Sequence, residues 1–209
     1  MIHINNLSLK IKEDVILSDI TLNIKKGKIT GLVGRNGCGK TMLMKCITGF
    51  VRPTSGEVIF DNKKIGIDID FPDNTGIIIE TPSFVPYYTG LKNLMELAML
   101  QKKIGKKEVE AALKQVGLYE ARNKMVRKYS LGMKQRLGIA QALMEHPDTL
   151  ILDEPMNGLD NECVKMVRNI LMKLKEEGKT ILLVSHNAED IRVLCDEIYE
   201  MDKGKIIVG

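Results

Sequence analysis

Residues 34 to 41 read GRNGCGKT and match the pattern G-x-x-x-x-G-K-[ST]. Residues of these types at this spacing suit a loop that holds phosphate groups. Glycines let the backbone approach phosphate oxygens and aim N–H groups at them, and the helix that follows adds the positive end of its dipole. Lys40 can bridge the β- and γ-phosphates of ATP, and the Thr41 hydroxyl can bind Mg²⁺. The sequence predicts nucleotide contacts from Gly34, Asn36, Gly37, Cys38, Gly39, Lys40, Thr41 and Met42.

Cys38 lies inside this loop and has two interpretations. Its thiol can be activated by the surrounding amides, or it stands there because only a small side chain fits, which we favour. The loop by itself does not name a function, because small-molecule kinases, GTPases, helicases and transport ATPases all carry one.

Two acidic residues end the apolar stretch 150–152. Successive side chains of a strand point to opposite sides, so we expect Asp153 and Glu154 on opposite sides of this one. Asp153 can then serve as an outer-sphere ligand of Mg²⁺, while Glu154 acts as the general base for an attacking water. Without the phosphate loop, helix capping or a surface position would explain the pair equally well.

Two more polar positions follow the acidic pair. Asp160 ends the turn Asn157-Gly158-Leu159-Asp160 and can cap the helix behind it. His186 lies 32 residues after Glu154, at the end of the apolar stretch TILLVS. A lone histidine is usually structural, but at the C-terminal edge of a parallel sheet it is well placed to contact a γ-phosphate.

The elements that position these residues alternate between helix and strand from residue 130 onwards, which indicates a parallel sheet with helical crossovers. The predicted fold class is α/β: a P-loop NTPase core, an N-terminal antiparallel β subdomain and an inserted helical subdomain. One domain covers 1–209, with the core at about 1–82 and 146–209 and the helical subdomain at about 83–145. The predicted elements are strands 2–9, 15–24, 28–34, 76–80, 149–154 and 180–185, a hairpin 56–65, helices 41–50 and 187–195, a helical stretch without strands over 91–128, and a β pair around Lys203-Gly204.

Composition excludes several classes of protein. The net charge of +4 is too small to argue for nucleic acid as a partner. Four cysteines without a C-x-x-C pair fit a reducing cytosol rather than a disulfide framework. Because there is neither a secretory signal nor a run of 18 apolar residues, we expect membrane contact only through a partner.

Taken in order, the phosphate loop, the helical insertion, YSLGMKQR, LILDEP, NGLD and VSH resemble the ATP-binding subunit of an ABC transporter along essentially the whole chain. The resemblance implies two ATPase subunits, homodimer or paralogue, that pair head to tail and enclose two ATP molecules. It also implies that Ser130 and Gly132 contact the γ-phosphate on the other subunit. Asp160 then lies at the dimer seam, and His186 senses the γ-phosphate.

The sequence departs from the family pattern in four places, namely the signature turn, the residue after Thr41, the adenine-stacking position and Glu80. Leu131 and Met133 replace a glycine and a glutamine, and Met42 replaces a hydroxyl residue, which leaves only its backbone N–H for the α-phosphate. Ile11 stands near the usual adenine-stacking aromatic and can cover the base by dispersion. Glu80 replaces a glutamine that touches Mg²⁺ and couples to the permease.

Glu80 and the stretch SLGMKQRLGIA resemble the bacitracin-resistance and lantibiotic-immunity exporters of Gram-positive bacteria. The resemblance implies membrane permease subunits as partners, a place on the inner face of the cell membrane, and residues 84–88 lining the permease groove. Packing of these aromatic residues inside the helical insertion is the alternative. The competing functions are a soluble ATPase that acts on DNA or ribosomes and a regulatory nucleotide-binding module without turnover.

Overall fold

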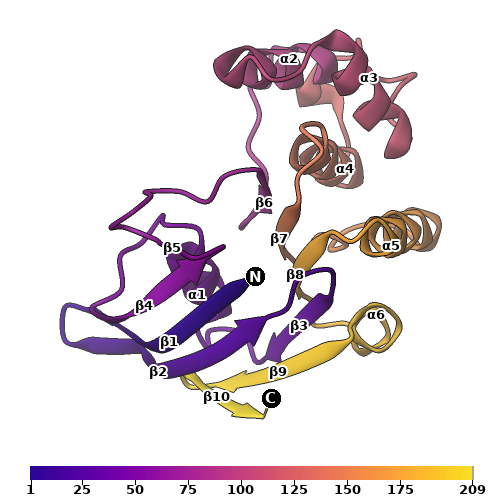
Figure 1. The fold of residues 1–209 in the computed structure, drawn as a ribbon. Helices are drawn as coiled ribbons and strands as arrows, with labels where there is room; N and C mark the ends of the chain where they lie inside the picture. Colours follow the sequence, from indigo (N-terminus) through magenta and orange to yellow (C-terminus); the bar gives the residue numbers. More distant parts are fainter. Residues whose placement is uncertain (209) are drawn as a thin grey trace.

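The structure, a computed structural model, describes residues 1–208 and is built around two β-sheets (Figure 1). Strands β3, β6, β7, β8 and β9 run parallel to their neighbours, and β10 joins β9 antiparallel. This arrangement confirms the predicted α/β fold class. In order across the sheet, the strands are β10 (Lys205–Val208), β9 (Glu197–Asp202), β3 (Ile29–Gly34), β8 (Thr180–Val184), β7 (Thr149–Asp153) and β6 (Thr75–Ile78).

The central strands bury both of their faces, because alternate side chains enter two different cores. In β7, Leu150 and Leu152 pack into the core on one face, and Ile151 packs into the core on the other. In β8, Ile181 and Leu183 pack into the first of these cores, and the side chains that alternate with them pack into the second. Burial of each such side chain stabilises the fold by about 1.5–3 kcal/mol. The strands, and with them the positions of their ends, are therefore held firmly.

The second sheet is antiparallel and covers helix α1 (Lys40–Ile47) on the side away from the first sheet (Figure 1). The predicted hairpin forms through Asp61 and Asn62, whose positive φ angles of 46° and 66° give the turn a twist that suits paired strands. In order across this sheet, the strands are β2 (Asp14–Ile24), β1 (Ile2–Ile11), β4 (Ser55–Phe60) and β5 (Lys63–Lys64).

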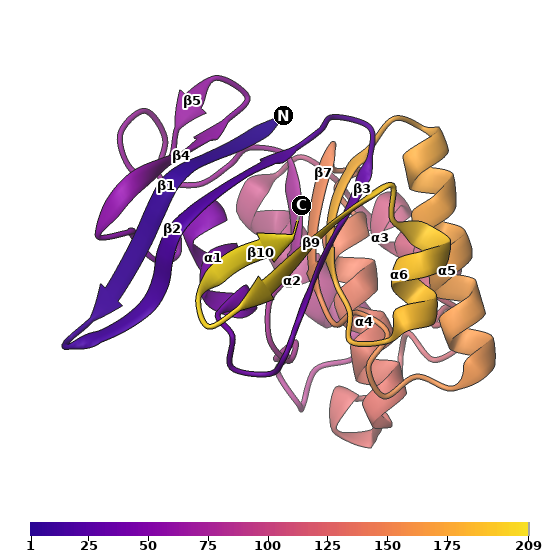
Figure 2. The same cartoon turned by 90° about the horizontal axis from the view of Figure 1, so that it is seen from below.

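On the opposite face of the six-stranded sheet lie α5 and α6, whereas α2 and α3 lie beyond α4, away from the sheet (Figure 1). Helices α5 and α6 lie side by side there, as Figures 1 and 2 show from two directions. Segment 83–145 holds three helices, and the last of them packs against β6. The bounds are α2 (Gly90–Gln101), α3 (Lys106–Gln115), the 3₁₀ turn η1 (Val126–Lys128), α4 (Leu131–Leu143), α5 (Asn161–Glu176) and α6 (Ala188–Leu194).

Two predicted helices are shorter than expected, and the predicted helical stretch is confirmed as helical but divided. The helix predicted over 41–50 ends at Ile47, because Gly49 turns the chain with φ 81° where a side chain would meet the Asp70 carbonyl at 2.0 Å. The predicted helical stretch 91–128 is two helices and a 3₁₀ turn, and Gly117, with φ 66°, follows the end of α3. The helix predicted over 187–195 is α6, Ala188–Leu194, because Asn187 lies outside it as the capping residue.

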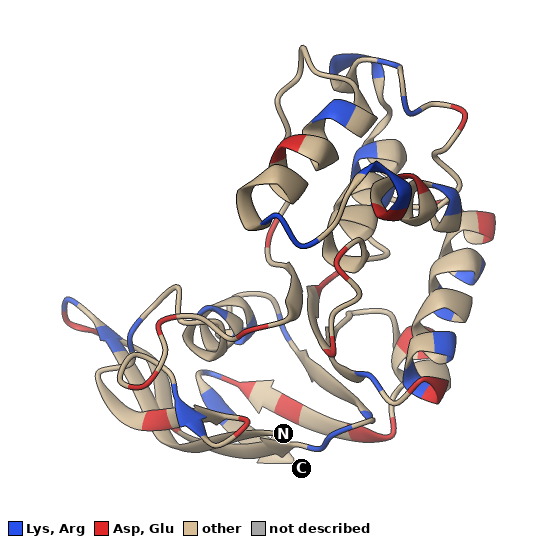
Figure 3. Ribbon diagram, turned by 45° about the horizontal axis from the view of Figure 1, so that its top comes forward, with Lys and Arg blue, Asp and Glu red and all other residues tan. Residues whose placement is uncertain are grey.

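Basic and acidic residues are interspersed along the ribbon rather than gathered by sign (Figure 3). This distribution agrees with solvated helix faces rather than a one-signed surface. Within residues 1–208, no helix combines the length and the apolar character needed to cross a membrane.

Candidate nucleotide-binding site

The predicted phosphate loop connects β3 to α1. Gly34 has φ 148°, and a side chain on it would come within 2.1 Å of the Met201 carbonyl oxygen. Gly39 begins α1 with φ 109°. Both positions need glycine because the backbone is left-handed there and its neighbours are close.

The N-terminus of α1 differs from those of α2, α4, α5 and α6. Those four are capped by the side chains of Thr89, Ser130, Asp160 and Asn187. The first turn of α1 has neither a side-chain cap nor an acidic residue. Its N–H groups and the positive end of its dipole therefore suit an anion.

Lys40 lies across this loop. Its Nζ donates hydrogen bonds to the carbonyl oxygens of Gly34 (2.6 Å) and Arg35 (3.0 Å). The Cys38 Sγ is 3.8 Å from the same Nζ, and the Cys38 side chain is buried. The ammonium group is thus held beside the loop amides, where it can join them in binding phosphate oxygens.

Thr41 and Asp153 join α1 to the end of β7. The Thr41 hydroxyl donates to Asp153 Oδ2 at 2.8 Å, although the residues are 112 positions apart. A hydroxyl and a carboxylate beside a phosphate loop are the hard oxygen donors that Mg²⁺ prefers, so these side chains fit the predicted ion.

The direction of the Glu154 side chain comes from its backbone conformation. The prediction had derived this direction from strand alternation, and that reason was wrong. Strand β7 ends at Asp153, and Glu154 follows in the left-handed region with φ 49°. Its N–H donates to the Val184 carbonyl at 3.0 Å, and its carbonyl accepts from Gln135 Nε2 at 3.2 Å. Non-glycine residues held in this region are often found at functional sites.

His186 and Glu154 form a close pair. The His186 Nδ1 is 2.8 Å from Glu154 Oε2. An ionised carboxylate can only accept a hydrogen bond, so Nδ1 must carry the proton in this pair. Nε2 is then the ring nitrogen that remains for a second partner.

Glu80 follows β6 as Glu154 follows β7. It also has a left-handed backbone, with φ 62°. Its Oε1 lies 2.5 Å from Lys45 Nζ on α1. Contact of Glu80 with a metal remains a prediction, and its partner in the structure is this lysine.

A cavity of about 570 Å³ lies between the loop and the ends of β6 and β7. Nine of the predicted residues line it together, and so do residues that sequence reasoning missed, namely Ile16, Thr81, Gln135 and Asn157. Gln135 could have been noticed as a candidate, because it is a polar residue at a buried position of its helix. The predicted residues that line the cavity are Asn36, Gly37, Gly39, Lys40, Thr41, Met42 and Glu80, joined by Asp153 and Glu154.

The remaining predicted residues lie elsewhere. Ile11 is exposed at the end of β1, and Ile16 rather than Ile11 lines the cavity. His186 lines a second cavity of about 480 Å³ that also touches Glu154. Contact of Ile11 with the base therefore remains a prediction.

Ser130 and Asp160 cap two different helices. Ser130 Oγ accepts from the Met133 amide at 3.2 Å, and Asp160 Oδ1 accepts from the Cys163 amide at 2.8 Å, which confirms the predicted cap at Asp160. Hydrogen bonds from Cys163 lower the pKa of Asp160. A side chain on Gly132 would lie 3.3 Å from the Gly158 carbonyl oxygen, so the two capped turns are neighbours within one chain.

Residues 84–88 divide between the two interpretations predicted for them. Phe84 is partly buried and packs against the core. Val85 and Tyr87 are exposed, and the Arg127 guanidinium lies 5.4 Å from the centre of the Tyr87 ring. Part of this stretch is therefore structural, and part of it is accessible to a partner.

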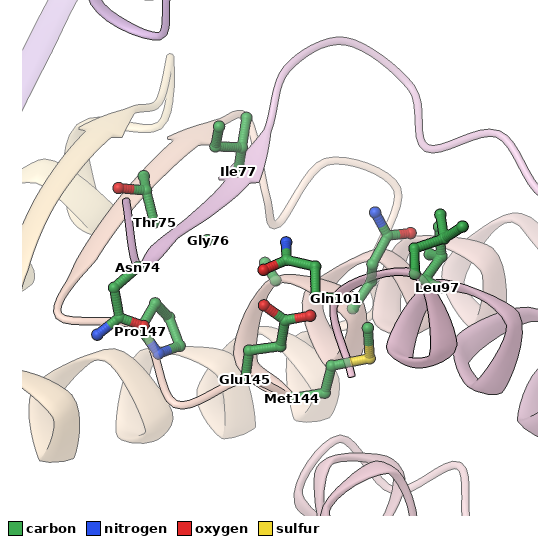
Figure 4. A pocket seen from close by; sticks show the side chains of 12 residues that line it. Asn74, Thr75, Gly76, Ile77, Leu97, Gln101, Met144, Glu145 and Pro147 are labelled. Atoms are coloured by element: carbon green, nitrogen blue, oxygen red, sulfur yellow. The ribbon is translucent and has the colours of Figure 1, made fainter. Parts of the chain in front are cut away.

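A further cavity, of about 220 Å³, lies along the β6 edge (Figure 4). Gly76 of β6 approaches α4 here, since a side chain on it would lie 2.1 Å from the Ala142 carbonyl oxygen, and the cavity is also lined by Gln101, which ends α2, and by Glu145, which follows α4. None of the predicted site residues lines this cavity. It lies where the helical segment meets the edge of the sheet.

The sequence matches the profile of the family described as "ABC transporter" over residues 17–157, which is more than half of the chain. The chain belongs to the ABC transporter family. This finding confirms the resemblance on which the motifs were interpreted. The match includes the phosphate loop and the acidic pair after β7.

This ABC protein is similar to curated transport proteins along nearly its whole length. It is 44% identical over 210 residues to the bacitracin transport ATP-binding protein BcrA of Enterococcus faecalis, covering 99% of this chain and 68% of that protein. It is 39% identical over 211 residues to the lantibiotic transport ATP-binding protein SrtF of Streptococcus pyogenes, covering 100% and 90%. The predicted resemblance to the bacitracin and lantibiotic branch is confirmed.

Solved structures of the family have the same fold. The dimeric structure of MJ0796, a bacterial ABC transporter cassette, matches with a TM-score of 0.89 at 29% identity and covers 100% of this chain and 97% of that one. A dimeric post-hydrolysis state of MJ0796 bound to ADP and Pi matches with a TM-score of 0.88 at 28% identity, with the same coverage. The chain is thus an ATP-binding cassette of the ABC family.

Proposed function

We propose that this chain is the ATP-hydrolysing subunit of a membrane exporter for antimicrobial peptides or drugs. The observation that carries the proposal is the meeting of two pairs beside one phosphate loop: Thr41 with Asp153, and Glu154 with His186. A module that only binds nucleotide has no need for a paired carboxylate and imidazole there. The relatives that transport bacitracin and lantibiotics support the class of cargo.

In this mechanism the loop amides and Lys40 hold the phosphates of ATP. Thr41 and Asp153 would hold Mg²⁺, which when bound neutralises charge on the phosphate oxygens. Glu154 accepts a proton from the attacking water, and its pairing with His186 Nδ1 keeps the carboxylate in place for that step. His186 Nε2 is then the nitrogen that contacts the γ-phosphate.

Two such subunits, copies of this chain or paralogues, would pair head to tail with two ATP molecules between them. Each subunit would offer Ser130 and Gly132 to the phosphate on the other. Leu131, which is 63% exposed beside these residues, supports a contact that the single chain leaves open. The dimeric MJ0796 structures support the same arrangement.

The membrane partner would be a permease, which places the subunit on the inner face of the membrane. A cavity of about 280 Å³ supports this partner, since it is lined by Phe50 and by residues 81–83, just after Glu80. The Phe50 ring lies 5.9 Å from the ring of Phe71, and both side chains are more than half exposed. Exposed apolar side chains next to the Glu80 segment suit an apolar helix of a permease.

The test uses the Glu154→Gln variant on a sizing column with ATP and Mg²⁺. Loss of the base should stop hydrolysis while ATP still binds, so the dimer with enclosed ATP should accumulate and elute at twice the monomer mass. Glu162→Gln is the matched control, because Glu162 is an exposed glutamate in the first turn of α5. A Glu154→Gln protein that binds ATP but stays monomeric would refute the paired arrangement.

A further inference from the structure

Asp190 is a buried carboxylate that the proposed mechanism does not use. It belongs to the first turn of α6, and its side chain is only 3% exposed. A buried charge is costly unless it is paired and hydrogen-bonded. Asp190 therefore needs partners, and those partners are informative.

Arg168 of α5 is the first partner. Its Nε donates to Asp190 Oδ1 at 2.8 Å, and its Nη2 donates to the same oxygen at 2.5 Å. Nη2 also reaches Glu189 Oε2 at 3.1 Å. The guanidinium is itself mostly buried, so α5 and α6 are joined by a charge pair shielded from solvent.

Ser185 is the second partner, and it holds the backbone on both sides of His186. Its hydroxyl donates to Asp190 Oδ2 at 2.9 Å and accepts from the Asn187 amide at 3.1 Å. The His186 side chain is 65% exposed, and the ring contact it makes within the described chain is with Glu154. The position of His186 is thus set largely by its loop, and the loop is anchored on Asp190.

Arg168 lies in the middle of α5 and connects Asp190 to the N-terminal end of this helix. The helix begins at its cap, Asp160, eight residues before Arg168, or about 12 Å along a rigid helix. The cavity of about 480 Å³ lies between the turn before α5 and the His186 loop, and Arg168 and Asp190 line it. Movement of the Asp160 turn would therefore reach His186 through α5 and this ion pair.

We infer that Arg168 and Asp190 act as positioning residues that set His186 according to the position of α5 and its Asp160 turn. The inference rests on the proposed hydrolytic function and adds to it a connection between the expected dimer seam and the histidine. Neither residue lines the cavity of about 570 Å³ proposed to hold ATP. Their effect reaches the chemistry through Ser185 and the backbone of His186.

A purely structural pair gives a different expectation. Buried ion pairs can often be replaced by apolar residues of similar volume without loss of stability. The double variant Arg168→Met/Asp190→Leu, in which leucine keeps the branching of aspartate at Cγ, should therefore fold with a melting temperature near that of the wild type. In it Ser185 loses its acceptor, so the loop of His186 is released although the helices stay packed.

The experiment measures steady-state ATP hydrolysis by the full chain for the wild type, Arg168→Met, Arg168→Lys and the double variant. We expect kcat to fall about 2- to 30-fold in Arg168→Met and in the double variant, the usual range for coupling residues, with KM for MgATP unchanged. Arg168→Lys should recover part of the loss, because it keeps the charge. Lys173→Met is the matched control, since Lys173 is an exposed residue of the same helix with a weak ion pair to Glu177.

A second measurement does not depend on turnover. The chain has three histidines, so ¹⁵N NMR can resolve the His186 ring. The wild type should show Nδ1 protonated beside Glu154, and the double variant should show a mixture of tautomers. The control variant should match the wild type.

Two results would overturn the inference. One is a double variant with the kcat and the His186 tautomer of the wild type, which would make the pair structural only. The other is a fall in kcat that only follows a fall in melting temperature and that Arg168→Lys does not recover. A wild type that hydrolyses no ATP would instead count against the proposed function. The NMR measurement would still test whether the Arg168–Asp190 pair positions His186.

Discussion

Two glutamates follow neighbouring parallel strands, and the molecule holds them differently. Glu80 comes after β6 and Glu154 after β7, and both have a left-handed backbone. Each carboxylate meets a nitrogen from another element, Lys45 for Glu80 and His186 for Glu154. The two strand ends thus share a backbone conformation, and each places a glutamate opposite a nitrogen of another element.

The difference lies in what surrounds each side chain. Glu154 is 25% exposed, and its backbone is fixed on both sides by Val184 and Gln135. Glu80 is 62% exposed, and within the described chain its side chain hydrogen-bonds with Lys45. The first arrangement suits a base with one fixed position. The second suits a residue that exchanges partners when the segment leading to α2 moves.

The largest expected effect separates the two acids by their chemistry. Glu154→Gln removes the general base and should lower kcat for ATP hydrolysis by about 10²- to 10⁴-fold. Glu80→Gln is the matched substitution one strand away and should lower kcat far less. Steady-state hydrolysis by both variants checks this, and equal losses would remove the distinction between the two strand ends.

The next effect tests the support of Glu154. Gln135 is a buried glutamine of α4 whose Nε2 donates to the carbonyl oxygens of Glu154 (3.2 Å) and Pro155 (3.1 Å). Gln135→Leu leaves these oxygens without their donor and should lower the free energy of unfolding by about 1–3 kcal/mol. Urea unfolding measures the change.

Gln115→Leu is the control for that substitution, because Gln115 is exposed at the end of α3. We also expect Gln135→Leu to slow ATP hydrolysis more than Glu80→Gln does, since it loosens the backbone of the base. If both leucine variants are as stable as the wild type, Gln135 does not hold Glu154 in place.

The comparison also shows what the sequence could predict. The strands along the chain, the phosphate loop and the acidic pair follow from local patterns, because glycine spacing and apolar runs are visible in short windows. The side of Glu154 was assigned by strand alternation, but its direction comes from a left-handed residue after the strand has ended. No periodic pattern marks such a residue.

The pairings that hold the site were missed for a related reason. Lys45 with Glu80, Gln135 with Glu154, and Arg168 with Asp190 join residues 35, 19 and 22 positions apart on different elements. Each partner alone has an ordinary place on a helix or at a strand end. The pairing becomes visible only when the sheet fixes which strand ends are neighbours.

The smallest expected effect concerns the exchangeable acid. The Glu80 side chain of the Lys45–Glu80 pair is mostly exposed to water, so the coupling energy of the pair in a double-mutant cycle of Lys45→Met and Glu80→Gln should be at most about 1 kcal/mol. Stability and ATP affinity should therefore change little. Transport by the complex with its permease should change more, because Glu80 precedes the segment proposed to meet the permease. Parallel assays of ATP affinity and transport check this, and an equal loss of both in Glu80→Gln would make Glu80 a nucleotide contact like its neighbour rather than a coupling residue.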